Sequence, residues 1–190
     1  MNIGLFGGTF DPIHNGHIRL AELFRKRLQL DEVWFLVTPQ NPWKTGKRLS
    51  DDRLRLEMAR KALEGYDGLV ASDYEYHLPK PSFSYQTLRN LRHDFPADSF
   101  TLLIGADNWV AFDKWAEHEE IMQHHRIAVF PRLNSDFNPH ALPQGVCFLD
   151  APLLNVSSTE VRERICRGED VSGLIPDVVK KYIEENGLYT

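Results

Sequence analysis

The sequence has little cysteine, no excess of positive charge and no long hydrophobic run. Its two cysteines, Cys147 and Cys166, form no close-spaced pair. Together with the lack of a recognisable signal peptide, this predicts a protein of a reducing compartment, the cytoplasm. No apolar run approaches the roughly 20 residues that a bilayer-spanning helix needs, so we expect no membrane partner. The formal net charge of −5 argues against a nucleic-acid partner, because such proteins carry a basic face.

The length and composition are those of a compact enzyme. The chain has 190 residues, of which 42% are hydrophobic and 26% are charged. This is enough for one substantial core and short for two, so we expect a single domain over residues 1–190. No ligand-type cluster of His, Cys or acidic residues occurs at a recognisable spacing, and we expect no metal site built by the protein alone.

Short apolar runs alternate with helical patterns along the chain. The runs predict strands at 3–6, 33–37, 69–72, 100–104, 127–130 and 146–149. Helices are expected after residue 17, from a Ser50 N-cap to about residue 63, and at 85–93, 117–124, 158–166 and 176–186. This alternation predicts an α/β protein with a parallel sheet, whose ligands bind at the carboxyl ends of the strands.

The most informative segment is the run GGTFDPIHNGH, from Gly7 to His17, between the first strand and the first helix. Glycines allow a phosphate to approach the backbone closely, and a helix N-terminus attracts anions. The run matches neither the P-loop nor the dinucleotide fingerprint. It therefore predicts a phosphate-handling site in which the two histidines need a role of their own.

Three roles are open for His14 and His17, which lie one helical turn apart and can face one ligand. They can be surface or capping residues, zinc ligands, or donors to a phosphoryl group whose charge rises in the transition state. The zinc role lacks further ligands. The glycines beside the pair favour the phosphoryl role.

Other residues allow both a structural and a functional interpretation. A serine at 157 or 158 can simply cap a helix with a solvated Arg162, or the free N–H groups and the arginine can hold an anion. Gly105 and Asp107 can form an ordinary turn after a strand or contact a ribose. Trp115 can be a core residue or a stacking platform, and Lys44 a solvated or a phosphate-binding cation.

Several ordered segments decide between these interpretations by resemblance. The run from Gly8 to His17 resembles the signature of the HxGH nucleotidyltransferases, and its longer form is similar to that of bacterial nicotinate-nucleotide adenylyltransferases. Further matches follow in the same order over nearly the whole chain: Pro42-Trp43-Lys44, Ser82 to Leu88, Ile104 to Asp107 with Trp115, and Asn155 to Arg162. Phe83, Gln86 and Ala116 depart from the residues common at those positions.

The resemblance implies a Rossmann-like, doubly wound parallel sheet with a small C-terminal helical extension. It implies an enzyme of NAD biosynthesis that transfers AMP from ATP to nicotinate mononucleotide and releases pyrophosphate, with Mg²⁺ carried by the ATP. The implied catalytic residues are His14, His17, Lys44 and Arg162. The implied ATP-binding residues are Gly7, Gly8, Thr9, Phe10, His17, Gly105, Asp107, Ser158, Thr159 and Arg162, and the implied acceptor-binding residues are Lys44, Ser84, Tyr85 and Trp115.

Two alternatives remain from the sequence. The acceptor can instead be nicotinamide mononucleotide or phosphopantetheine, or the protein can bind nucleotides as a regulator without turnover. The sequence also leaves the oligomeric state open, including a homo-oligomer. The segments 38–47 and 133–145, which contain many Pro, Asn and Gly residues, are expected to be the most mobile.

Overall fold

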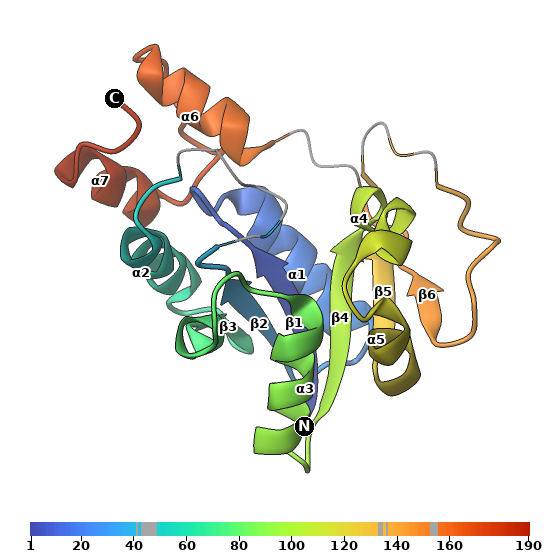
Figure 1. The fold of residues 1–190 in the computed structure, drawn as a ribbon. Helices are drawn as coiled ribbons and strands as arrows, with labels where there is room; N and C mark the ends of the chain where they lie inside the picture. The colour runs from blue at the N-terminus through green and yellow to red at the C-terminus, as the bar shows by residue number, and fades with distance from the viewer. Residues whose placement is uncertain (41, 43–48, 133–134, 136, 153–155) are drawn as a thin grey trace.

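The protein is an α/β sandwich built on one twisted sheet (Figure 1). A computed structural model describes residues 1–40, 42, 49–132, 135, 137–152 and 156–190. Its strands are β1 (Asn2–Gly8), β2 (Glu32–Val37), β3 (Leu69–Ser72), β4 (Ser99–Gly105), β5 (Arg126–Phe130) and β6 (Val146–Phe148). Its longer helices are α1 (Asn15–Arg27), α2 (Asp52–Leu63), α3 (Ser84–Asp94), α6 (Ser158–Cys166) and α7 (Asp177–Glu185). Its shorter helices are η1 (Tyr74–His77), α4 (Ala106–Val110), η2 (Phe112–Lys114) and α5 (His118–His124).

The sheet order is β3-β2-β1-β4-β5-β6, and every neighbouring pair is parallel. The chain winds outward from β1 in one direction through β2 and β3, and then in the other direction through β4, β5 and β6. This confirms the predicted doubly wound sheet. The order reverses between β1 and β4, and in such sheets the crevice at that point binds the ligand.

Alternate residues of each central strand enter two separate cores. Phe6, Phe35 and Leu103 face the core that α1, α2, α6 and α7 cover. Their neighbours Leu5 and Leu102 face the core that α3 and α5 cover. Burial on both faces explains why the strands read as continuous apolar runs rather than as alternating ones.

The element boundaries agree with the sequence prediction except at a few ends. The prediction that Ser50 caps α2 was wrong. Asp51 is the N-cap, and its carboxylate accepts from the N–H of Arg53 at 2.9 Å. Helix α5 begins one residue later than expected, because Glu117 adopts the left-handed conformation with φ 53°. The short elements η1, α4 and η2 were not predicted, since so few residues carry no clear periodicity.

Candidate active site

The loop that joins β1 to α1 ends in a mutual cap between two histidines. His14 is the N-cap of α1, and its Nδ1 accepts from the N–H of His17 at 3.3 Å. In return, Nδ1 of His17 accepts from the N–H of His14 at 3.2 Å. The rings stack, with centroids 3.5 Å apart and planes 16° from parallel. In a neutral imidazole one nitrogen accepts and the other donates, so this arrangement leaves Nε2 of each ring as the donor.

Burial keeps His14 neutral. Its side chain is 5% exposed, and burial, reinforced by the positive charge of Arg132, lowers its pKa to about 4. A neutral ring can donate from Nε2 without adding a buried charge to the resting site. The capping role that the sequence left open and a donor role toward a ligand are therefore compatible in one residue.

We expect acid to destabilise the protein through His14. Its pKa is about 4 in the folded protein and about 6.5 in the unfolded chain, so between these values the unfolded chain binds more protons. As the pH falls from 7 to 4.5, this residue alone should lower the free energy of unfolding by about 2 kcal/mol. His14→Asn retains an N-cap acceptor but does not titrate. Urea unfolding of both proteins at both pH values checks this, and an equal loss in the variant would contradict it.

Two glycines make the loop geometry possible. A Cβ on Gly16 would lie 2.7 Å from Cγ1 of Val156 and 3.0 Å from Nδ1 of His14, so only glycine fits beside the stacked rings. A Cβ on Gly8 would lie 3.0 Å from the ring of Phe10. The space around Gly7 is different, because nothing lies within 4 Å of its Cβ position. Gly7 and Gly8 both line the cavity described below.

The N-terminus of α6 lies against the same loop, as Figure 1 shows at the upper ends of the strands. Ser157 caps the helix by accepting from the N–H of Glu160, and the hydroxyl of Ser158 donates to the carbonyl of Pro12 at 2.9 Å. Nη1 of Arg162 donates to the carbonyl of Asp11 at 2.7 Å, and Nη2 donates to Oγ1 of Thr159 at 3.3 Å. The structure thus brings Ser158, Thr159 and Arg162 to the loop.

Asp11 anchors the loop from inside. Its carboxylate is buried and accepts from the hydroxyl of Tyr189 at 2.6 Å and from the N–H of Ser50 at 3.3 Å. Burial and this carboxylate raise the pKa of Tyr189, which therefore stays a hydroxyl donor. Residues far from the loop in the sequence therefore hold it in place. Sequence reasoning missed Tyr189, since it belongs to no recognisable motif.

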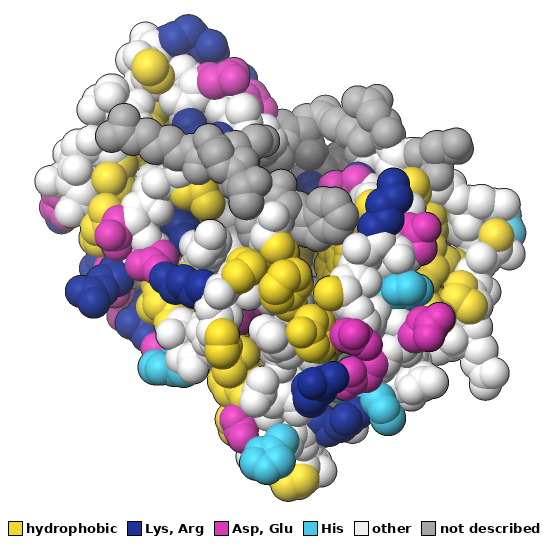
Figure 2. Space-filling view, viewed as in Figure 1, with side chains coloured by type: hydrophobic (Ala, Val, Ile, Leu, Met, Phe, Trp, Pro, Cys, Tyr) yellow, Lys and Arg dark blue, Asp and Glu magenta, His cyan; other side chains and the backbone are white. Residues whose placement is uncertain are grey.

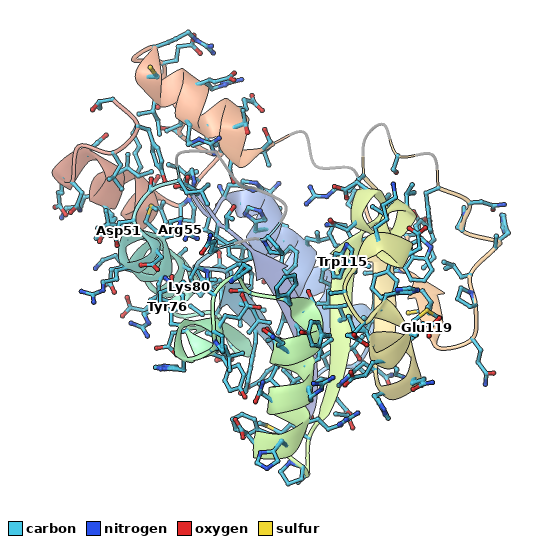
Figure 3. All side chains as sticks on the ribbon, in the orientation of Figure 1. Asp51, Arg55, Tyr76, Lys80, Trp115 and Glu119 are labelled. Atoms are coloured by element: carbon cyan, nitrogen blue, oxygen red, sulfur yellow. The ribbon has the colours of Figure 1, made fainter. Side chains whose placement is uncertain are left out.

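A cavity of about 620 Å³ opens at the crevice between β1 and β4. Five of the predicted site residues line it: Gly7, Gly8, Ser84, Gly105 and Trp115. Figure 2 shows hydrophobic side chains gathered near the centre of this face, above α3, with charged side chains around them. Trp115 is labelled in Figure 3 beside α4 and packs on Phe112 with ring centroids 5.3 Å apart. The cavity has the mixed polar and aromatic lining of a small-molecule site.

Arg132 is a site residue that sequence reasoning missed. It lines the cavity at the carboxyl end of β5, and its Nε lies 3.8 Å from the carboxylate of Asp107. Both side chains lie over Gly105, where a Cβ would be 2.4 Å from Oδ1 of Asp107 and 2.8 Å from Cγ of Arg132. The available signal was an arginine two residues after the end of a buried strand. Asp107 itself does not line the cavity.

Some predicted residues do not line the cavity. The carbonyl of Thr9 accepts from Arg55, and the ring of Phe10 packs edge-on against those of Phe6 and His17. The ring of Tyr85 lies under the guanidinium of Arg89, with 5.3 Å between the arginine Cζ and the ring centroid, and does not line the cavity. Lys44 lies outside the described residues.

A buried polar group on the cavity wall was also missed. Glu75 lines the cavity, and its Oε1 accepts from the hydroxyl of Thr87 at 2.9 Å. Burial raises the pKa of this carboxyl group. Within the described residues, Oε2 of Glu75 and the hydroxyl of Ser82 have no hydrogen-bond partner. Both precede α3 in the chain. Ser82 belongs to the matched segment that begins there, whereas nothing in the sequence around Glu75 distinguishes it from ordinary loop residues.

Comparison with known proteins identifies the family of this chain. The family model described as cytidylyltransferase-like matches residues 5–164. A relative from Bacteroides fragilis, named a probable nicotinate-nucleotide adenylyltransferase, is 42% identical over 96% of this chain and 91% of its own length. The chain belongs to the nicotinate-nucleotide adenylyltransferase family. A second member, from Flavobacterium psychrophilum and with the same name, is 41% identical over 100% of this chain and 99% of its own length.

Solved structures of the family share the fold. The nicotinic acid mononucleotide adenylyltransferase of Plasmodium falciparum, complexed with NaAD, superposes with a TM-score of 0.84 at 20% identity. The match covers 99% of this chain and 97% of that one. None of the helices in the described ranges combines the length and apolar character that a bilayer crossing requires.

Proposed function

We propose that the protein transfers AMP from ATP to the 5′-phosphate of nicotinate mononucleotide, giving nicotinate adenine dinucleotide and pyrophosphate. The observation that carries the proposal is the convergence of two helix N-termini, those of α1 and α6, on the loop that holds the stacked His14 and His17. Helix N-termini present N–H donors and a partial positive charge to phosphates. The names of the relatives and the ligand of the Plasmodium structure support the same reaction.

The chemistry needs charge neutralisation more than a base. The acceptor phosphate is an anion at neutral pH, so its oxygen can attack the α-phosphorus of ATP directly. The new P–O bond forms while the bond from the α-phosphorus to the bridging oxygen breaks, and the electron pair leaves with pyrophosphate. The protein's task is to hold the two anions in line and to stabilise the charge that develops on the phosphoryl oxygens.

The described residues divide this task between them. We assign the Nε2 donors of His14 and His17 to the transferring phosphoryl group and Arg162 with the first N–H groups of α6 to the triphosphate. Gly7 and Gly8 let the triphosphate approach the backbone. Arg132 supplies a further positive charge on the cavity wall. Lys44 remains a proposed phosphate-binding cation.

Mg²⁺ belongs to the substrate in this proposal, because triphosphate oxygens are the hard ligands that it prefers. In the parts of the chain that the structure describes, no group of three or more His, Cys, Asp or Glu side chains is placed to hold a metal ion. The metal supplies positive charge to the triphosphate when it is bound. The protein's own donors then complete the charge balance around the α-phosphoryl group.

A direct assay tests the reaction. The purified protein is mixed with ATP and Mg²⁺ and, in parallel, with nicotinate mononucleotide, nicotinamide mononucleotide or phosphopantetheine, and pyrophosphate release is measured. We expect release with the nicotinate acceptor. Release with another acceptor alone would reassign the substrate, and ATP binding without release in any mixture would indicate a nucleotide-binding regulator.

We expect the enzyme to prefer the nicotinate acceptor over the nicotinamide acceptor by at least about tenfold in kcat/KM. The first N–H groups of α3, at Ser84 and Tyr85, have no acceptor within the helix, and Ser84 lines the cavity. A ring carboxylate can accept from both N–H groups, whereas an amide presents its own NH₂ to one of them and leaves it unpaired. Competition between the two acceptors in one reaction measures the ratio. Equal use of both would contradict the selectivity.

Trp115→Ala should raise the KM for the acceptor about tenfold and change the KM for ATP much less, because stacking on an aromatic ring contributes on the order of 1 kcal/mol or more. Steady-state kinetics with each substrate varied in turn measures both values. Trp109→Ala is the matched control, since Trp109 also packs on Phe112, with ring centroids 5.2 Å apart, and does not line the cavity. A parallel rise in both KM values would make Trp115 a general packing residue.

A further inference from the structure

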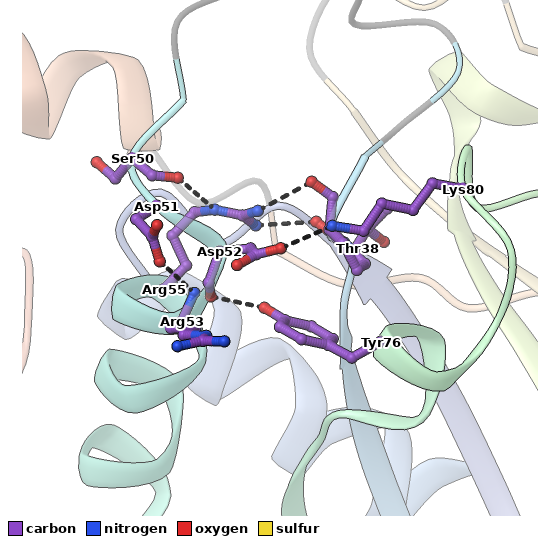
Figure 4. Close-up of polar contacts among 9 residues, drawn as sticks. Thr38, Ser50, Asp51, Asp52, Arg53, Arg55, Tyr76 and Lys80 are labelled. Atoms are coloured by element: carbon purple, nitrogen blue, oxygen red, sulfur yellow. Dashed lines mark hydrogen bonds and ion pairs between the residues drawn. The ribbon is translucent and has the colours of Figure 1, made fainter.

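Arg55 is a fully buried arginine whose side chain, among the described residues, donates hydrogen bonds only to backbone carbonyls. It lies on α2 and is 1% exposed. Nε donates to the carbonyl of Ser50 at 3.1 Å, and Nη2 donates to that of Pro39 at 3.2 Å. Nη1 donates to two carbonyls, those of Thr9 at 2.6 Å and Thr38 at 2.9 Å. Figure 3 places Arg55 at the upper end of α2, and Figure 4 shows its contacts with Ser50 and Thr38.

A buried cation of this kind is an unfavourable choice for packing alone. The neighbouring buried positions of α2 are apolar, with Leu56, Met58 and Ala59. No carboxylate of a described residue forms an ion pair with Arg55, and the network reaches a buried acid only through Ser50, whose N–H donates to Asp11. Leaving water is costly for a charged group, and an apolar side chain would avoid that cost. The residue type therefore points to a role in its carbonyl contacts.

These carbonyls belong to three segments at the ends of β1, β2 and α2, two of which contribute Gly8 and Thr38 to the cavity. Thr9 follows β1, Thr38 and Pro39 follow β2, and Ser50 precedes α2. Thr38 lines the cavity, and its N–H donates to the carbonyl of Gly8 at 2.8 Å. Figure 4 shows further contacts that hold α2 itself, where the hydroxyl of Tyr76 and the ammonium of Lys80 reach Asp52. Arg55 thus joins the carboxyl ends of two central strands to a fixed helix.

The contact with Thr9 also sets the direction of one peptide group. In a planar trans peptide the C=O and N–H point in opposite directions. Since the carbonyl of Thr9 points toward Arg55, the N–H of Phe10 points away from it. Phe10 has φ 45°, a left-handed conformation that is uncommon for a residue with a bulky side chain. A strained conformation persists only where surrounding contacts enforce it, and the short bond from Arg55 is such a contact.

We propose that Arg55 is a positioning residue for the triphosphate of ATP. It holds the peptide between Thr9 and Phe10 so that its N–H faces the phosphates, and it fixes Thr38 relative to Gly8 at the rim of the cavity. Arg55 does not touch the substrate in this role. The inference rests on the proposed adenylyl transfer for its substrate, but its structural part concerns the backbone of the loop and can be tested separately.

The test compares two variants. Arg55→Met keeps a long unbranched side chain and removes every N–H donor, whereas Arg55→Lys keeps the positive charge and some of the N–H donors. We expect Arg55→Met to weaken Mg·ATP binding and kcat/KM for ATP about tenfold, with the acceptor KM changed less than threefold. Arg55→Lys should recover part of this loss. Arg53→Met, an exposed position on the same helix, is the matched control and should behave as the wild type.

Hydrogen–deuterium exchange gives a readout that does not depend on turnover. In Arg55→Lys, peptides that cover residues 8–12 and 37–40 should exchange faster, while those from β4 and β5 should be unchanged. If Arg55→Met does not fold, the lysine variant alone decides the question. The proposal would be overturned if exchange at residues 8–12 were unchanged or if exchange became faster throughout the protein. It would also be overturned if kcat/KM fell equally for ATP and for the acceptor. If the wild type transfers AMP to no acceptor, the proposed function fails. The Mg·ATP binding titration and the hydrogen–deuterium exchange measurement still decide the role of Arg55.

Discussion

His17→Ala is expected to lower turnover by roughly 10²-fold while the affinity for Mg·ATP changes only a few-fold. The capped geometry directs Nδ1 of His17 to the N–H of His14 and leaves Nε2 as a donor for the transferring phosphoryl group. A donor that acts mainly in the transition state affects kcat more than ground-state binding. Parallel measurements of turnover and of Mg·ATP affinity by titration check this.

A second substitution separates catalysis from capping at this position. In a capping box, a glutamine three positions after the N-cap accepts from the N-cap N–H. His17→Gln can therefore keep the cap and the stability of α1 while it loses the imidazole donor, and we expect a turnover defect close to that of the alanine variant. His93→Ala, at an exposed position, serves as the control. If affinity falls as steeply as rate in both variants, His17 is a binding or structural residue.

Arg162→Ala is expected to weaken Mg·ATP binding by roughly 10- to 100-fold at low ionic strength, with a smaller difference at high salt. Arg162 lies one turn inside α6, where its guanidinium reaches the loop at Asp11 and the hydroxyl of Thr159. A charge-assisted contact to phosphate is strong but is screened by salt. Titrations at two or more salt concentrations measure both the loss and its salt dependence.

Arg164→Ala is the matched control for this prediction. Arg164 is on the same helix and pairs with Glu160 at 2.7 Å, so its removal changes the net charge of the protein by the same amount. We expect its Mg·ATP affinity to stay near that of the wild type. An unchanged affinity in Arg162→Ala at low salt would show that Arg162 only ties α6 to the loop.

The sequence predicted the central elements well because their signals are local. The strands containing Phe6, Phe35 and Leu103 are buried on both faces, so each appears as an apolar run bounded by polar or turn residues. The cap of α2 was misassigned because Ser50 and Asp51 are both good N-caps, and only the backbone geometry selects one. Short helices such as α4 carry too few residues for a periodic signal.

The candidate site was predictable where it coincides with a motif. His14 and His17 form their cap and stack within one turn of helix, so their spacing alone places them together. Arg162 was also in a motif, but its contact with the carbonyl of Asp11 joins residues far apart in the sequence. The pairing of Asp107 with Arg132 likewise depends on the adjacency of β4 and β5.

The sequence by itself determined the order of strands and helices, the glycine loop before α1 and the identity of the family. Only the tertiary structure decided what holds that loop. Arg55 donates a hydrogen bond to the carbonyl of Thr9, and the hydroxyl of Tyr189 donates one to the carboxylate of Asp11. The physical reason is that helix and strand patterns depend on neighbours within a few positions, whereas the partners of a buried polar group are set by how distant segments pack. An arginine in a helical pattern looks like a solvated residue until the carbonyls that surround it are in place.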